Sequence, residues 1–145
     1  DVEKILYNYD IKLKYIDFNS LEGDKNKSVQ GACILNKNKY CIYIQYDLKY
    51  HRKRYAIAVQ LGHIFLKHLD KNIDNDSSIC YFNKDVYYKV DNSMNNELIE
   101  AIYFAKELLM PKSDIINESK KGICLFLSSI MEIFNVSKMA MINRL

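Results

Sequence analysis

One long stretch, residues 54–69, constrains the fold more than any other part of the sequence. Its apolar and small residues recur every three or four positions, which is the spacing of one face of an α-helix. No proline interrupts the stretch, so the helix can run unbroken. We therefore predict a buried central helix here, with His63 on it and Val59 four residues earlier on the same face. The recurring positions are Tyr55, Ala58, Gly62, Phe65 and Leu69.

The composition is typical of one soluble globular domain, which we expect to span residues 1–145. Of the 145 residues, 49% are hydrophobic and 27% are charged, which suffices for a single core. The net charge of +3 is weak for a nucleic-acid-binding protein, whose basic residues usually cluster on one face. No apolar run approaches the ~20 residues that cross a membrane. Four cysteines without a C-x-x-C pair favour free thiols in a reducing cytoplasm; they are Cys33, Cys41, Cys80 and Cys124.

Three strands are predicted before the central helix. Residues 11–17 alternate apolar and polar side chains, which indicates a half-buried strand. Residues 31–35 and 40–45 read as two further strands, and the turn-like residues 36–39 favour an antiparallel hairpin between them. We therefore predict an α+β fold in which a small, three-stranded, mostly antiparallel sheet packs on the central helix.

The second half of the chain is predicted to be mainly helical. A long connection, residues 70–92, contains two short extended pieces and is long enough to have a function of its own. Ser93 is a plausible N-cap for a helix that ends before Pro111, the only proline of the chain. The remaining expected elements are extended pieces at 79–82 and 86–90, helices at 113–119 and 123–134, and a last helix capped by Ser137.

Two motifs in these helices resemble the ImmA/IrrE family of zinc metallopeptidases. The first is Val59-Gln60-Leu61-Gly62-His63, where the family reads H-E-L-G-H. The second is the run from Glu100 to Pro111, where the family reads close to E-A-N-x-F-A-x-E-L-L-M-P and this chain has Ile102 for the asparagine. The resemblance covers most of the chain. It implies a zincin-like single domain, with His63 and Glu100 as zinc ligands.

The first motif departs from the family at the two positions that carry its chemistry. A zinc peptidase needs three protein ligands, an open fourth position and a general base. Two histidines four apart on one helix supply two ligands, and the glutamate beside the first is the base. Here Val59 has no donor atom, and Gln60 is a neutral amide that cannot act as a base. We therefore expect the HExxH motif to be degenerate, with no intact catalytic residue.

Zinc binding is correspondingly expected to be weak or absent. His63 and Glu100 are the remaining candidate ligands. His68 and Glu97 are the possible substitutes for the lost one. His68 follows His63 by five residues, or about 140° around a continuous helix, so we expect it to be a poor replacement.

Three functions are compatible with the sequence. The first is a non-catalytic regulator that binds a protein partner, such as a helix-turn-helix repressor of a mobile element or prophage, and acts as an antirepressor. The second is an active zinc-dependent endopeptidase with a rearranged ligand set that cleaves such a repressor. The third is a DNA-associated regulator that uses the two C-terminal helices and the basic cluster Lys49, His51, Arg52, Lys53 and Arg54.

Overall fold

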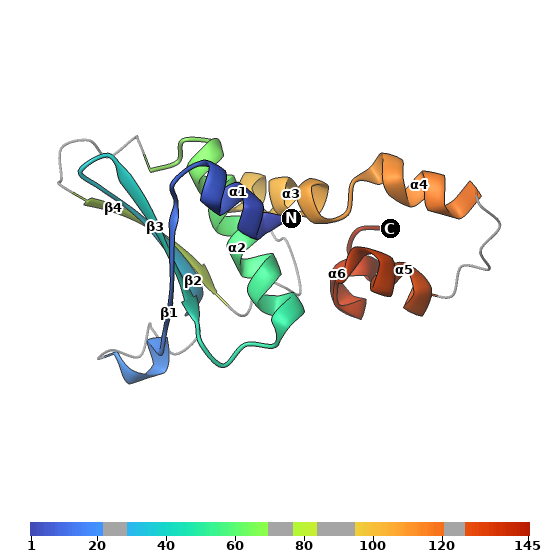
Figure 1. Cartoon of the computed structure of the whole chain (residues 1–145), viewed down its shortest axis with the longest axis horizontal. Coiled ribbons are helices and arrows are strands. Elements are labelled where there is room, and N and C mark those ends of the chain that lie inside the picture. Colours follow the sequence, from blue (N-terminus) through green and yellow to red (C-terminus); the bar gives the residue numbers. More distant parts are fainter. Residues whose placement is uncertain (22–28, 70–76, 84–94, 121–126) are drawn as a thin grey trace.

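The computed structural model describes residues 1–21, 29–69, 77–83, 95–120 and 127–145. These residues form an α+β fold in which helices α1, α2 and α3 lie on one side of a sheet (Figure 1). The last three helices lie beyond α3, away from the sheet. In chain order the elements are α1 (Val2–Asn8), β1 (Lys12–Ile16), η1 (Phe18–Ser20), β2 (Val29–Asn36), β3 (Lys39–Gln45), α2 (Tyr50–Phe65), β4 (Ser77–Asn83), α3 (Asn96–Leu109), α4 (Lys112–Lys120), α5 (Leu127–Phe134) and α6 (Lys138–Ile142).

The described sheet has four strands in the order β1-β3-β2-β4, with mixed pairing. β1 is parallel to β3, whereas β2 is antiparallel to both β3 and β4. The prediction of a three-stranded sheet is therefore wrong, because residues 79–82 belong to a full strand that adds to β2. Local patterns cannot show this pairing, since it joins strands far apart in the chain. The α+β class and the helical C-terminal half are confirmed.

The hairpin of β2 and β3 has the predicted two-strand arrangement. Lys37 and Asn38 connect the strands with φ angles of 47° and 60°. Two successive residues with positive φ form the tight turn whose twist matches that of paired strands. The extended piece predicted at 86–90 and the N-cap predicted at Ser93 lie outside the described residues. α3 begins instead behind Asn95, whose side chain accepts a hydrogen bond from the Glu97 backbone N–H.

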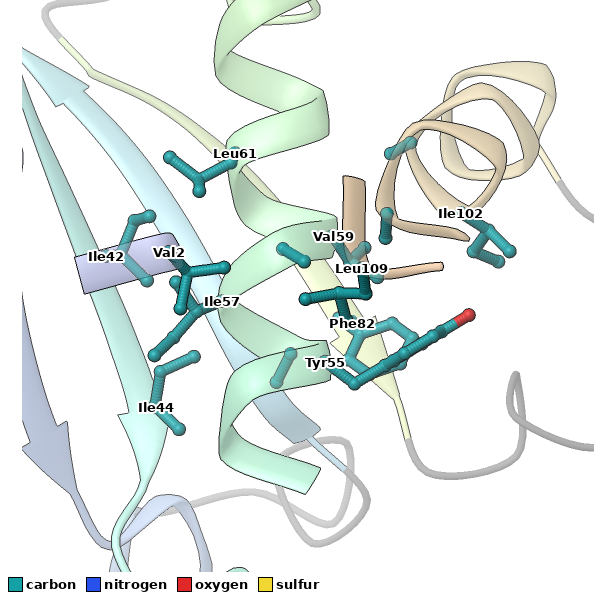
Figure 2. Packing of buried hydrophobic residues seen from close by; sticks show 14 of the residues in the cluster. Val2, Ile42, Ile44, Tyr55, Ile57, Val59, Leu61, Phe82, Ile102 and Leu109 are labelled. Atoms are coloured by element: carbon teal, nitrogen blue, oxygen red, sulfur yellow. The ribbon is translucent and has the colours of Figure 1, made fainter. Parts of the chain in front are cut away.

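Helix α2 is the buried centre of the molecule, as predicted, but it begins earlier and ends earlier than expected. Every residue from Tyr55 to Ile64 is buried. Ile42, Ile44 and Ile57 pack between the sheet and α2 (Figure 2). On its other side α2 packs closely on α3, where a Cβ added to Gly62 would lie 2.8 Å from the Ala101 backbone. Only glycine permits this close approach.

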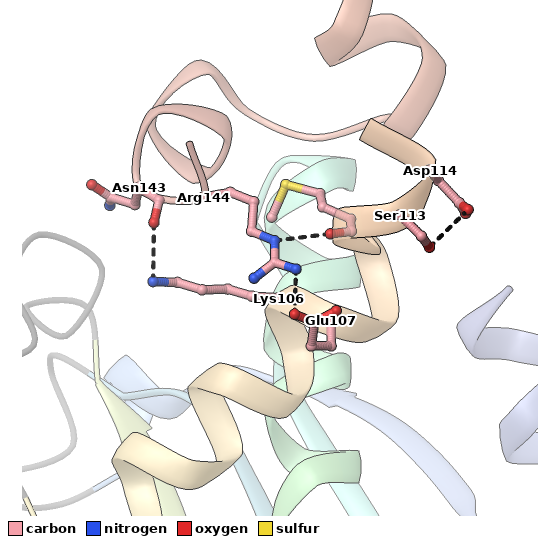
Figure 3. Close-up of polar contacts among 7 residues, drawn as sticks. Lys106, Glu107, Ser113, Asp114, Asn143 and Arg144 are labelled. Atoms are coloured by element: carbon pink, nitrogen blue, oxygen red, sulfur yellow. Dashed lines mark hydrogen bonds and ion pairs between the residues drawn. The ribbon is translucent and has the colours of Figure 1, made fainter. Parts of the chain in front are cut away.

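The C-terminal helices are attached to the core by charged side chains. Arg54, at the start of α2, donates hydrogen bonds from Nη1 to the carbonyls of Phe134 and Asn135, at 3.0 and 2.6 Å. Arg144 donates from Nε to the Met110 carbonyl at 2.9 Å and forms an ion pair with Glu107 (Figure 3).

Two further features of this region are local. Ser137 caps α6, as predicted, by accepting a hydrogen bond from the Ala140 N–H at 3.2 Å. No helix within the described residues is both long enough and apolar enough to span a membrane.

Candidate functional site

The chain reverses direction sharply where α2 ends, and this turn shapes the site. The Lys67 N–H donates to the Ile64 carbonyl at 3.1 Å, and the His68 N–H donates to the His63 carbonyl at 3.0 Å. Together with the left-handed φ of 58° at Lys67, these bonds form a Schellman C-cap. The cap folds His68 back over the last turn of the helix.

His68 consequently lies between His63 and Glu100. The two histidine Nδ1 atoms are 3.0 Å apart, and His68 Nε2 is 3.1 Å from Glu100 Oε2. Both histidines are only 3% exposed, whereas the Glu100 side chain is 61% exposed. The three side chains form a hydrogen-bonded chain from the surface of α3 into the core.

The carboxylate fixes the direction of these hydrogen bonds when His68 is neutral. An ionised Glu100 only accepts, so His68 must donate from Nε2, and its Nδ1 is then an acceptor. His63 donates from Nδ1 to that nitrogen and keeps a lone pair on Nε2. This Nε2 atom is buried and has no hydrogen-bond partner in the described part of the chain. The site therefore presents one free imidazole lone pair.

Val59 and Gln60, which the resemblance predicts to stand at a ligand position and a base position, are part of the core. Both residues are 0% exposed. Val59 belongs to the main hydrophobic cluster and lies on the side of α2 that faces α3 (Figure 2). Neither amide atom of Gln60 has a hydrogen-bond partner in the described residues. Neither side chain supplies a metal ligand or a proton acceptor to His63.

The thiol of Cys80 lies near His63, and Cys33 lies next to Cys80. Cys80 of β4 is directly opposite Cys33 of β2. The Cys33 thiol and then the His63 imidazole hold the pKa of Cys80 below its usual value. Burial, followed by the Cys80 contact, raises the pKa of Cys33 well above its usual value. No sequence signal could have found this pair, because it depends on the pairing of β2 with β4.

These side chains do not fit the zinc site that the resemblance implies. Val59, which the resemblance predicts to stand at the first ligand position, is buried and has no donor atom, and the hydrogen bond to His68 engages Glu100. No group of three or more His, Cys, Asp or Glu side chains within the described ranges is arranged to hold a metal ion.

The candidate residues named from the sequence are only partly brought together. His63 and Glu100 are linked through His68 rather than converging on one point. The rotation of about 140° does not apply to His68, because the helix ends at Phe65 and the chain turns back. The expectation that His68 is a poor replacement ligand stays a prediction. Glu97 lies close enough for its charge to oppose the lowering of the Cys80 pKa.

A hollow of about 380 Å³ lies on the sheet, over strands β1, β2 and β3. Its lining contains four lysines and no acidic residue, and Tyr43 also lines it beneath the ammonium group of Lys14. The lysines are Lys12, Lys14, Lys37 and Lys39.

The fold is an α+β domain in which a mixed sheet packs on a buried helix that carries His63, and His68 links this histidine to Glu100 of a second helix. Residues 8–145 match the IrrE N-terminal-like domain family of M78 peptidases, and the chain belongs to this family. No curated protein matches the chain.

Proposed function

We propose that this chain is a non-catalytic member of its family that works by binding a protein partner. The observation that carries the proposal is the fully buried Val59 at the position of the first zinc ligand. Gln60 supports it, because a neutral amide cannot take a proton from a water molecule. A family scaffold without its ligand set or base retains its surface, and binding remains available as a function.

The partner that we propose is a helix-turn-helix repressor of a mobile element or prophage, with this chain acting as an antirepressor. This class of partner comes from the resemblance to active ImmA/IrrE proteins, which cut such repressors. Binding alone would sequester the repressor and release its target genes.

The test uses the full chain and a helix-turn-helix repressor from a mobile element of the same host. Calorimetry measures binding, and intact mass spectrometry follows the repressor with zinc in excess. We expect binding with no change in the repressor's mass. A cleaved repressor would overturn the non-catalytic assignment, and failure to bind any such repressor would overturn the binding role.

The double variant Val59→His/Gln60→Glu is the matched control, since it restores both family residues. We expect elemental analysis to find zinc in the double variant and little in the native chain. Zinc in the native chain at one ion per molecule, lost in His63→Ala, would favour the alternative of an active endopeptidase with a rearranged ligand set.

A DNA-associated role is the second candidate, and the lysine-lined hollow is the observation that favours it. Phosphate contacts would make the affinity fall steeply as salt increases. The basic cluster at the start of α2 gives less support, because Arg54 is engaged by the carbonyls of Phe134 and Asn135. A flat salt response, or no shift with any DNA, would exclude this role.

A further inference from the structure

Cys33 and Cys80 face each other across two neighbouring strands. They are direct partners in the antiparallel register of β2 and β4. Directly opposed residues in antiparallel strands have Cα atoms about 4.5–5.5 Å apart, which lies within the roughly 4.4–6.8 Å range of disulfides. The two thiols lie close enough for each to shift the pKa of the other. Bond formation therefore requires little movement of the backbone.

The two cysteines differ in accessibility. Cys33 is 0% exposed, whereas Cys80 is half-buried. A small oxidant in solution reaches Cys80 first, and Cys33 is positioned to react second. This is the usual division between an attacking thiol and a resolving thiol.

We propose that Cys33 and Cys80 are a dithiol modification site that a small-molecule disulfide oxidises to a disulfide across β2 and β4. The Cys80 thiolate attacks one sulfur of the oxidant, forms a mixed disulfide and releases one small-molecule thiolate. The Cys33 thiolate then attacks the Cys80 sulfur, closes the protein disulfide and releases the second thiolate. The released thiolates take up the two protons that the cysteines lost, so the protein is oxidised by two electrons and the oxidant is reduced by two.

The disulfide would also change the surroundings of His63. It removes the ionisable Cys80 thiol that lies near the imidazole. It also joins β4, at the end of the sheet, covalently to β2.

The experiment exposes the reduced full chain to oxidised glutathione, blocks the remaining thiols with an alkylating reagent, and maps the peptides by mass spectrometry. We expect a Cys33–Cys80 peptide pair, the loss of two hydrogens from the intact mass, and a higher Tm than that of the reduced chain. The peptide map uses the native sequence, so it does not depend on whether a variant folds.

Three variants test which cysteines take part in the reaction. Cys41→Ser is the matched control, because Cys41 lies on β3 opposite Ile34 rather than opposite a cysteine, and it should oxidise like the native chain. Cys33→Ala should stop at a stable glutathione adduct on Cys80, and Cys80→Ala should leave Cys33 unmodified. Stable glutathione adducts in the native chain, or a disulfide that includes Cys41 or Cys124, would overturn the proposal.

Discussion

Gln60 is a polar residue in the hydrophobic core of this chain. Its amide is fully buried, and neither the oxygen nor the nitrogen has a hydrogen-bond partner among the described residues. Burying an unsatisfied polar group costs about 1–3 kcal/mol. The buried Gln60 amide therefore destabilises the fold.

Replacing Gln60 by methionine should stabilise the protein. The variant keeps a similar side-chain length and removes both unsatisfied polar atoms, so we expect a gain of about 1–2 kcal/mol in the free energy of unfolding. Chemical denaturation measures it. A loss of stability would show that the amide has a partner, such as a buried water molecule.

Replacing Gly62 by alanine should destabilise the protein. The new Cβ would lie 2.8 Å from both Cα and O of Ala101, and backbone atoms cannot move aside as the end of a side chain can. Overpacking of this kind costs about 1–3 kcal/mol, which outweighs the ~1 kcal/mol that alanine gains over glycine in a helix. We expect a lower denaturation midpoint.

Gly31→Ala is the matched control for this experiment. Its Cβ would meet only side-chain atoms, the closest being Ile44 Cδ1 at 3.1 Å. We expect a smaller loss of stability than for Gly62→Ala. The opposite order would mean that α2 and α3 separate more easily than their packing indicates.

At the scale of elements, the two ends of α2 contact different parts of the molecule. The C-terminal end folds His68 back onto His63 through its Schellman cap. The N-terminal end holds the turn between α5 and α6 through Arg54. One helix thus builds the candidate site and also attaches the C-terminal region.

Arg54→Ala should loosen this attachment. The guanidinium donates two charge-assisted hydrogen bonds to backbone carbonyls, and losing them should cost about 1–3 kcal/mol. Lys49→Ala is the control, because Lys49 makes no capping hydrogen bond with its side chain and should change stability by less than about 0.5 kcal/mol. Equal effects on the denaturation midpoint would contradict the proposed attachment.

The ion pair between α3 and the C-terminus should respond to pH. The hydrogen bond from Arg144 lowers the pKa of Glu107, so the folded state binds the proton more weakly than the unfolded state does. The stabilisation is therefore complete above the ordinary glutamate pKa and is lost as the pH falls through the lowered folded-state value. The effect should be small, because the carboxylate is exposed to solvent.

Glu107→Gln isolates this contribution. We expect a slightly lower Tm than that of the native chain at pH 7, and a difference that disappears in acid. Thermal denaturation of both proteins between pH 7 and pH 3 measures it. A constant difference across this range would mean that the amide substitution acts through packing rather than charge.

At the scale of the whole molecule, stability is unevenly distributed. The largest group of buried residues lies on α2 and on the strands against which it packs. α4, by contrast, has no buried residue. Local opening costs least where few apolar contacts are lost.

Hydrogen exchange should follow this distribution. We expect the slowest backbone amides in α2, β2 and β3, and much faster exchange in α4. Mass spectrometry of peptides after deuterium labelling measures the order, and the native chain at several concentrations is the control. Protection of α4 equal to that of α2 would indicate that another molecule covers α4.

The sequence by itself determined the central helix, the β2–β3 hairpin and the helical C-terminal half. Local periodicity, turn residues and capping residues are enough to predict these features. The motif resemblance also predicted that Val59 and Gln60 stand at a ligand position and a base position of the family. Only the tertiary structure decided that β4 pairs with β2, which brings Cys80 opposite Cys33. It also decided the reversal at Lys67 that joins His68 to His63 and Glu100. Both depend on contacts between distant residues or on one left-handed backbone angle, and neither leaves a periodic signal in the chain.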